Sequence, residues 1–318
     1  MSKGPSAALT SDEIGAMARD AIAEGQADRK QAASQKIQPL REAQRHQPEA
    51  AMALVWIVDQ HSLARDEAAG LLLEIADAHD DDIGVLSALG QCLEAVRDID
   101  DLNAPPPDHP IFRTMVEKLG RLAKLHEGPR EQEWILRGLA TAARMMARQN
   151  DAIAEHCLRK LVEIDPRKSP PHYNLGLFYK TRGRFAEGVA ANQAAASLSQ
   201  EVIDSHQWNL GICATGAGNA EIAMDVWKRM GQKIEPGRFG LPEGGYPACK
   251  VKLAERPLAE RAADSDDPGQ EETVWIERLS PCHGIIRSVL YGKLGVDYGD
   301  VILTDGAPIT HHTYGEQQ

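Results

Sequence analysis

An internal repeat within residues 169–236 limits the folds that this sequence can adopt. Leu175-Gly176 recurs as Leu210-Gly211, and Gly183 recurs as Gly218, in both cases after a shift of 35 residues. Each copy has one helical period of apolar residues before its internal glycine and another after it. We therefore expect each copy to form a helix–turn–helix unit.

The repeat resembles the tetratricopeptide repeat (TPR) family, whose signature is an aromatic residue, Leu-Gly, another aromatic residue, small residues in a second helix and a closing proline. These places are filled by Tyr173 or Trp208, Leu175-Gly176 or Leu210-Gly211, Tyr179, Phe185, Ala223 and Pro236. The resemblance implies a mostly α, right-handed solenoid of helical hairpins. Neighbouring hairpins in such a solenoid share one core, because a single hairpin cannot bury its apolar face alone.

Three more helix pairs are predicted upstream, over residues 48–78, 83–125 and 131–164, so that the solenoid spans 48–236. Fewer signature residues occur over 48–166 than over 169–236. The expected core of the first pair consists of Leu54, Trp56, Ile57, Leu71, Leu72 and Ile75.

Residues 1–47 are expected to form an N-terminal tail and a leader helix. A cap at Ser11-Asp12-Glu13 would start a polar, alanine-rich helix that continues to about Arg45, with interruptions at Gly25 and Pro39. Because its apolar face is thin, this helix is either a frayed leader or a helix that binds a partner.

The pattern changes after Pro236. Residues 237–247 are rich in glycine and proline and are expected to form a linker. Residues 248–318 are expected to form a small β-rich module, with four short strands in CKVKLAER, ETVWIERL, GIIRSVLYG and DYGDVILTDGAPIT. Asp305-Gly306 is a turn signal in the last of these segments.

The composition excludes several classes of protein. A net charge of −12 argues against general nucleic-acid binding, which needs a basic surface. No apolar run approaches the roughly 20 residues of a membrane span, and the N-terminus lacks the apolar core of a secretory signal. The five cysteines are scattered, which fits a reduced, cytoplasmic setting.

In TPR proteins the first helix of each repeat lines a concave groove, and the resemblance implies which residues line it here. They are Tyr173, Asn174, Leu177, Lys180, Thr181, Trp208, Asn209, Ile212 and Thr215. Asn174 and Asn209 precede Leu-Gly in both copies, and a carboxamide matches the C=O and N–H of a peptide backbone. The alternative is that both asparagines form hydrogen bonds locally within the solenoid.

A basic cluster of Lys180, Arg182 and Arg184 lies where the first helix ends and the turn begins. It would attract an acidic segment or a C-terminal carboxylate. Alternatively, these cations simply stabilise the C-terminal end of the helix dipole.

The β-rich module contains residue types that zinc prefers, namely Cys249, Cys282, His283, His311 and His312. No CxxC or HxxxH spacing accompanies them, so we expect no cofactor, with zinc as the alternative. Cys282 with His311 or His312 would be a nucleophile–base pair, but no third group is identifiable. Residues 280–284, SPCHG, are more simply explained as a turn between strands.

Two acidic clusters, Asp80-Asp81-Asp82 and Asp98 with Asp100-Asp101, lack the spaced array of oxygen ligands of a calcium loop. We expect helix caps and solvated surface at both. No phosphate-binding loop, dinucleotide fingerprint, GxSxG or HExxH motif is present.

The leading interpretation is therefore a non-enzymatic scaffold or adaptor that binds a peptide or partner protein in its groove. An enzyme or enzyme subunit with Cys/His chemistry in the β-rich module is the alternative. A homo-oligomeric assembly component is a third possibility.

Overall fold

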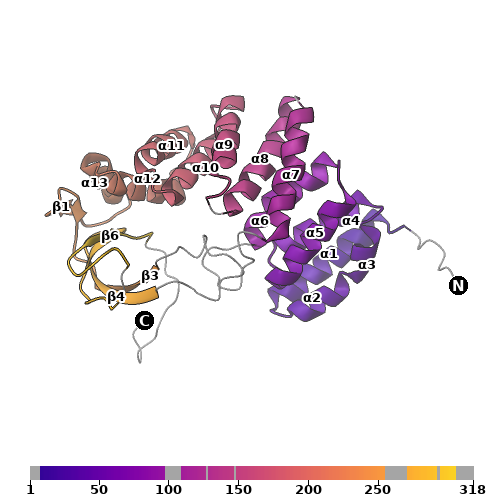
Figure 1. Ribbon diagram of the computed structural model, residues 1–318, viewed down its shortest axis with the longest axis horizontal. Helices are drawn as coiled ribbons and strands as arrows, with labels where there is room; N and C mark the ends of the chain where they lie inside the picture. Colours follow the sequence, from indigo (N-terminus) through magenta and orange to yellow (C-terminus); the bar gives the residue numbers. More distant parts are fainter. Residues whose placement is uncertain are drawn as a thin grey trace. The chain divides into compact units, whose positions relative to one another are not determined.

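The computed structural model describes residues 8–96, 109–126, 128–146, 148–254, 271–291 and 294–305. Within these residues the chain forms two compact units, the first ending at Ile164 and the second beginning at Asp165. The first unit is helical, and the second has helices followed by strands (Figure 1). The boundaries predicted after residues 47, 236 and 247 stay predictions.

The N-terminal region forms three helices, α1 (Ser11–Gln26), α2 (Lys30–Lys36) and α3 (Gln38–Ala43). The cap is Thr10, one residue earlier than predicted: its hydroxyl accepts a hydrogen bond from Glu13 N at 3.3 Å, and the Glu13 carboxylate accepts one from Thr10 N at 2.8 Å. This is a capping box.

Of the two alternatives for the leader, a frayed helix is not observed at α1, which packs against α2 and against α4 (Pro48–Asp59). Its buried residues follow the i, i+4, i+7, i+8 spacing of one helix face. They are Ile14, Ala18, Ala21 and Ile22. Small side chains form much of this stripe, which is why it looked thin in the sequence.

The remaining helices of the first unit are α5 (Arg65–Ala78), α6 (Ile83–Val96), α7 (Pro110–Leu125), α8 (Pro129–Met145) and α9 (Asp151–Ile164). Five of the six predicted core residues in α4 and α5 are completely buried. Trp56 is the exception, with 44% of its surface exposed. Each helical residue turns about 100°, so Trp56 points away from the face that carries Leu54 and Ile57.

Two glycines set the close contact between α6 and α8. A Cβ atom added to Gly90 would lie 2.8 Å from the Cα of Gly138. The backbones of the two helices therefore approach each other at a distance that no larger residue allows.

The second unit begins with two helical hairpins, α10 (Ser169–Thr181) with α11 (Phe185–Leu198) and α12 (Asp204–Gly216) with α13 (Ala220–Arg229). The predicted turns are confirmed. Gly183 and Gly218 have φ values of 70° and 71°, a backbone region that favours glycine. Their spacing of 35 residues therefore marks the same type of turn after the first helix of each hairpin.

The strands form two antiparallel sheets. β1 (Glu235–Pro236) and β2 (Pro242–Glu243) make a short ribbon that the sequence did not predict. The order of the larger sheet is β3-β4-β5-β6, formed by β3 (Cys249–Ala254), β4 (Glu271–Arg278), β5 (His283–Ile286) and β6 (Val301–Leu303). Its own apolar cluster centres on Val274, Ile276 and Ile286.

β5 ends earlier than predicted. Beyond Ile286, the side-chain oxygen of Ser288 accepts the hydrogen bond from Trp275 N, at 2.9 Å, in place of a backbone carbonyl. The predicted fold class is nevertheless confirmed. The chain is mostly α, with helical hairpins followed by a small β-rich region.

Candidate interaction surface

The predicted groove residues lie on α10 and α12, the first helices of the two hairpins of the second unit. Thr181 is exposed, and Tyr173, Asn174, Leu177, Lys180 and Trp208 are half-buried. Asn209, Ile212 and Thr215 are buried. The exposed part of this surface therefore lies mainly on α10.

The two asparagines of the predicted ladder share one property. Within the described residues, no hydrogen bond joins the side chain of Asn174 or Asn209 to any other group. Local hydrogen bonding, the alternative explanation for this pair, is thus not observed. Neither carboxamide is among the buried polar atoms that lack a partner in the described structure.

Lys180 and Trp208 both contact Asp305, which follows β6. Lys180 Nζ lies 2.7 Å from Asp305 Oδ2. The indole Nε1–H of Trp208 points to the backbone oxygen and to Oδ1 of Asp305, at 3.0 and 3.2 Å. One acidic residue thus receives hydrogen bonds from two helices of the predicted groove.

Ile212 and Thr215 belong to an apolar region that the C-terminal part of the chain completes. Cys282, just before β5, is buried in the same cluster as Ile212 and Trp227, and Leu303 packs against that cluster. Thr215 donates to Gly211 O at 2.8 Å and accepts from Trp227 Nε1 at 3.3 Å. These two predicted groove residues are therefore covered by the chain itself.

The two arginines of the basic cluster contact aromatic rings. The guanidinium of Arg182 lies 5.2 Å from the ring centre of Phe178, and that of Arg184 lies 4.6 Å from Tyr179. Arg184 also donates to Glu187 at 3.0 Å. Lys180, the third predicted cation, contacts Asp305 of the C-terminal region.

The Cys/His candidates do not converge in the part of the chain that the structure covers. Cys249 is half-buried in β3, whereas Cys282 and His283 are buried, and His311 and His312 lie outside the described residues. No group of three or more metal-ligating side chains occurs among the described residues. Burial raises the pKa of the Cys282 thiol to about 11, which keeps it protonated near neutral pH.

Ser280 fixes the conformation of the predicted turn between β4 and β5. Its hydroxyl oxygen accepts from the backbone N–H groups of Cys282 and His283, at 3.1 and 3.2 Å. The hydroxyl hydrogen then points to His283 Nδ1, at 2.5 Å. Burial lowers the pKa of His283 and so favours the neutral imidazole.

The acidic run at Asp80-Asp81-Asp82 behaves as expected. Asp82 Oδ1 accepts from Val85 N at 2.9 Å and so caps α6, while Asp80 and Asp81 form ion pairs with Arg121 at 2.8 and 3.0 Å. Asp98, Asp100 and Asp101 lie outside the described residues.

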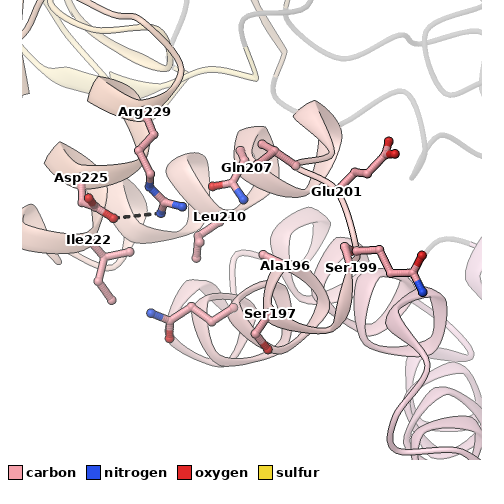
Figure 2. A pocket seen from close by; sticks show the side chains of 12 residues that line it. Ala196, Ser197, Ser199, Glu201, Gln207, Leu210, Ile222, Asp225 and Arg229 are labelled. Atoms are coloured by element: carbon pink, nitrogen blue, oxygen red, sulfur yellow. Dashed lines mark ion pairs between the residues drawn. The ribbon is translucent and has the colours of Figure 1, made fainter.

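A cavity of about 480 Å³ lies among α11, α12, α13 and the segment before α12 (Figure 2). Leu210 and Ile222 contribute apolar surface to it, and Arg229 and Asp225 form an ion pair of 2.8 Å at its edge. Gln207 Oε1 is buried without a hydrogen-bond partner in the described structure. None of the predicted groove residues lines this cavity, and the sequence did not predict it.

No helix in the described portion of the chain is long and apolar enough to span a membrane.

Several solved structures align with part of this chain. PilF of Pseudomonas aeruginosa is 13% identical, with a TM-score of 0.43 over 69% of this chain and 93% of its own. A MamA structure is 18% identical, with a TM-score of 0.38 over 52% of this chain and 80% of its own. A MamA fragment from Desulfovibrio magneticus RS-1 is also 18% identical, with a TM-score of 0.35 over 56% of this chain and 92% of its own. No family model and no curated protein matches the sequence.

Proposed function

We propose that this chain is a TPR-type protein-interaction scaffold whose partner contributes an extended segment that binds along α10 and α12. The observation that supports this proposal is the pair of carboxamides at equivalent positions of the two repeats, the half-buried Asn174 and the buried Asn209. Within the described residues neither side chain has a hydrogen-bond partner, and Asn174 is the more accessible of the two. A peptide backbone supplies both the donor and the acceptor that a carboxamide needs.

The remaining surface of α10 suits this role. Tyr173 and Leu177 offer partly exposed apolar area, and Thr181 adds a polar group at the end of the helix. A mixed surface of this kind is typical of interfaces in which an aromatic anchor sits beside polar groups that fix orientation. The partner would therefore bind through its backbone, with a side chain packed beside Tyr173.

The test is affinity capture from a lysate of the native source, followed by quantitative mass spectrometry. Wild type is compared with the Asn174→Ala/Asn209→Ala double variant and with Gln193→Ala, which removes an exposed carboxamide from the second helix α11. We expect a partner that wild type and Gln193→Ala recover equally and that the double variant recovers at least tenfold less.

Gln193→Ala should keep the melting temperature of the wild type, and the double variant should melt only slightly lower, because it loses packing around the buried Asn209 but no internal hydrogen bond. Equal recovery of every captured protein by all three would contradict the proposal. A large drop in the melting temperature of the double variant would instead assign the asparagines to the fold.

A further inference from the structure

Asp305 is bound by the groove as a ligand would be. Its two carboxylate oxygens and its backbone oxygen each receive a donor: Lys180 Nζ binds Oδ2 at 2.7 Å, and Trp208 Nε1 approaches Oδ1 and the carbonyl oxygen. Charge-assisted bonds of this type are stronger than neutral ones and select a carboxylate over an amide.

Both donors are well packed when Asp305 occupies the site. The Lys180 side chain is nine-tenths buried, with 10% of its surface exposed. The indole of Trp208 packs edge-on against the ring of Trp227, with the ring centres 5.2 Å apart and an angle of 78° between the ring planes. An ammonium group desolvated to this extent requires an anionic partner, so α10 and α12 together supply the donors of a carboxylate site.

Within the described residues, Asp305 lies beyond the paired part of the C-terminal region. β6 ends at Leu303, and the last backbone bond before Asp305 joins Thr304 N to Cys282 O at 2.7 Å. Half of the Asp305 side chain, 51%, is exposed. It can therefore leave the site while β6 stays paired with β5.

We propose that Lys180 and Trp208 form a binding site for an acidic residue in an extended protein segment, and that Asp305 occupies this site in the free chain. The inference rests on the proposed function, because the site lies on the same helices as the carboxamide pair. Occupancy by Asp305 lowers the apparent affinity for a partner in proportion to the fraction of closed molecules. The acidic residue of the partner replaces Asp305. The site thereby adds sequence specificity to the backbone contacts that the asparagines make.

The experiment uses an acetylated and amidated peptide that copies residues 301–305, VILTD, and therefore carries a single carboxylate. Its binding to the full chain is followed through the Trp208 indole N–H resonance in a nitrogen–proton NMR spectrum, assigned with Trp208→Phe. Wild type is compared with Asp305→Ala and with the matched control Glu221→Ala, which removes an exposed carboxylate from α13.

We expect the peptide to shift the resonance in Asp305→Ala at concentrations at least tenfold lower than in wild type or Glu221→Ala. Adding Lys180→Met to Asp305→Ala should abolish the shift, and a peptide ending in asparagine should bind at least tenfold more weakly. Unchanged dispersion of the other resonances shows that each variant is folded.

Equal shifts in wild type and Asp305→Ala, no shift in Asp305→Ala, or a shift that survives Lys180→Met would each overturn the inference. The capture experiment with the asparagine variants is independent of this result. A partner that needs Asn174 and Asn209, found together with an inert peptide, would refute the acidic site and leave the scaffold function standing.

Discussion

Gly211 lies directly against the indole of Trp227: a Cβ atom added to the glycine would be 2.5 Å from Cζ2 of the ring. In the preceding repeat, a Cβ on Gly176 would lie 2.6 Å from the carboxamide of Asn192. Gly176 and Gly211 are 35 residues apart in the sequence, and so are their contact partners, Asn192 and Trp227. The period in the sequence is therefore a period of contacts between the first and second helix of each hairpin.

Gly211→Ala should lower the free energy of unfolding by about 1–3 kcal/mol, because the ring of the completely buried Trp227 must shift. The matched control is Gly70→Ala in α5, where a Cβ would meet nothing within 4 Å. Since alanine favours helix over glycine, the control should be neutral or more stable by up to about 1 kcal/mol. Urea denaturation of both variants measures the difference, and equal stability would show that the helices separate at no cost.

Thr10→Ala should destabilise the first unit by about 0.5–2 kcal/mol, because it removes the hydroxyl that accepts the hydrogen bond from Glu13 N. Thr10→Ser retains that oxygen and serves as the control. Hydrogen exchange of the α1 amides gives the readout. If α1 were a frayed leader, its amides would exchange rapidly in the wild type and neither change would matter.

Stability should fall as the pH drops below about 6.5. Burial lowers the pKa of His283 in the folded state, so the unfolded chain takes up the proton first. The full contribution of the neutral imidazole is present above the ordinary pKa of 6.5 and is lost progressively as the pH falls towards the lowered value. One such proton accounts for at most about 1.4 kcal/mol per pH unit.

The measurement is the free energy of unfolding between pH 5.5 and 7.5 for wild type, His283→Asn and His61→Asn. Asparagine can accept the Ser280 hydroxyl hydrogen but does not titrate, so His283→Asn should flatten the pH dependence. His206, whose pKa burial also lowers, contributes the slope that remains. The exposed His61 is the control, and a flatter curve for it than for His283→Asn would contradict the assignment.

Cys249 should be the first of the described cysteines to react with iodoacetamide at pH 8. It is half-buried, whereas Cys92, Cys157, Cys213 and Cys282 are buried. Burial raises the pKa of Cys157 and Cys213 to about 12 and that of Cys282 to about 11, so their thiolates are scarce. Mass spectrometry with and without denaturant measures the order, and native-state labelling of Cys282 as fast as that of Cys249 would support the nucleophile interpretation.

The hairpins of the second unit were predictable because their signals are local. Gly183 and Gly218 end helices by adopting a positive φ, which needs no information from distant residues. Trp56 was misplaced for a different reason: α4 is apolar on most of its circumference, so hydrophobicity alone did not distinguish its buried face.

The contacts of the candidate surface could not be predicted in the same way. The bond between Lys180 and Asp305 joins residues 125 positions apart, and that between Trp208 and Asp305 spans 97. The only local signal at Asp305 was a turn dipeptide, which says nothing about a partner. The predicted groove residues were taken from the resemblance, which gives no information about the C-terminal segment that covers part of them.

The burial of Cys282 beside α12 and α13 also orders events during synthesis. Ile234 is the last residue of that cluster before the larger sheet, and about 50 residues separate it from Cys282. At 5–20 residues per second, a ribosome needs roughly 3–10 s to synthesise them. Until then the emerging second hairpin has an uncovered apolar side. The final repeat matures only after the β strands have left the ribosome, although it precedes them in the chain.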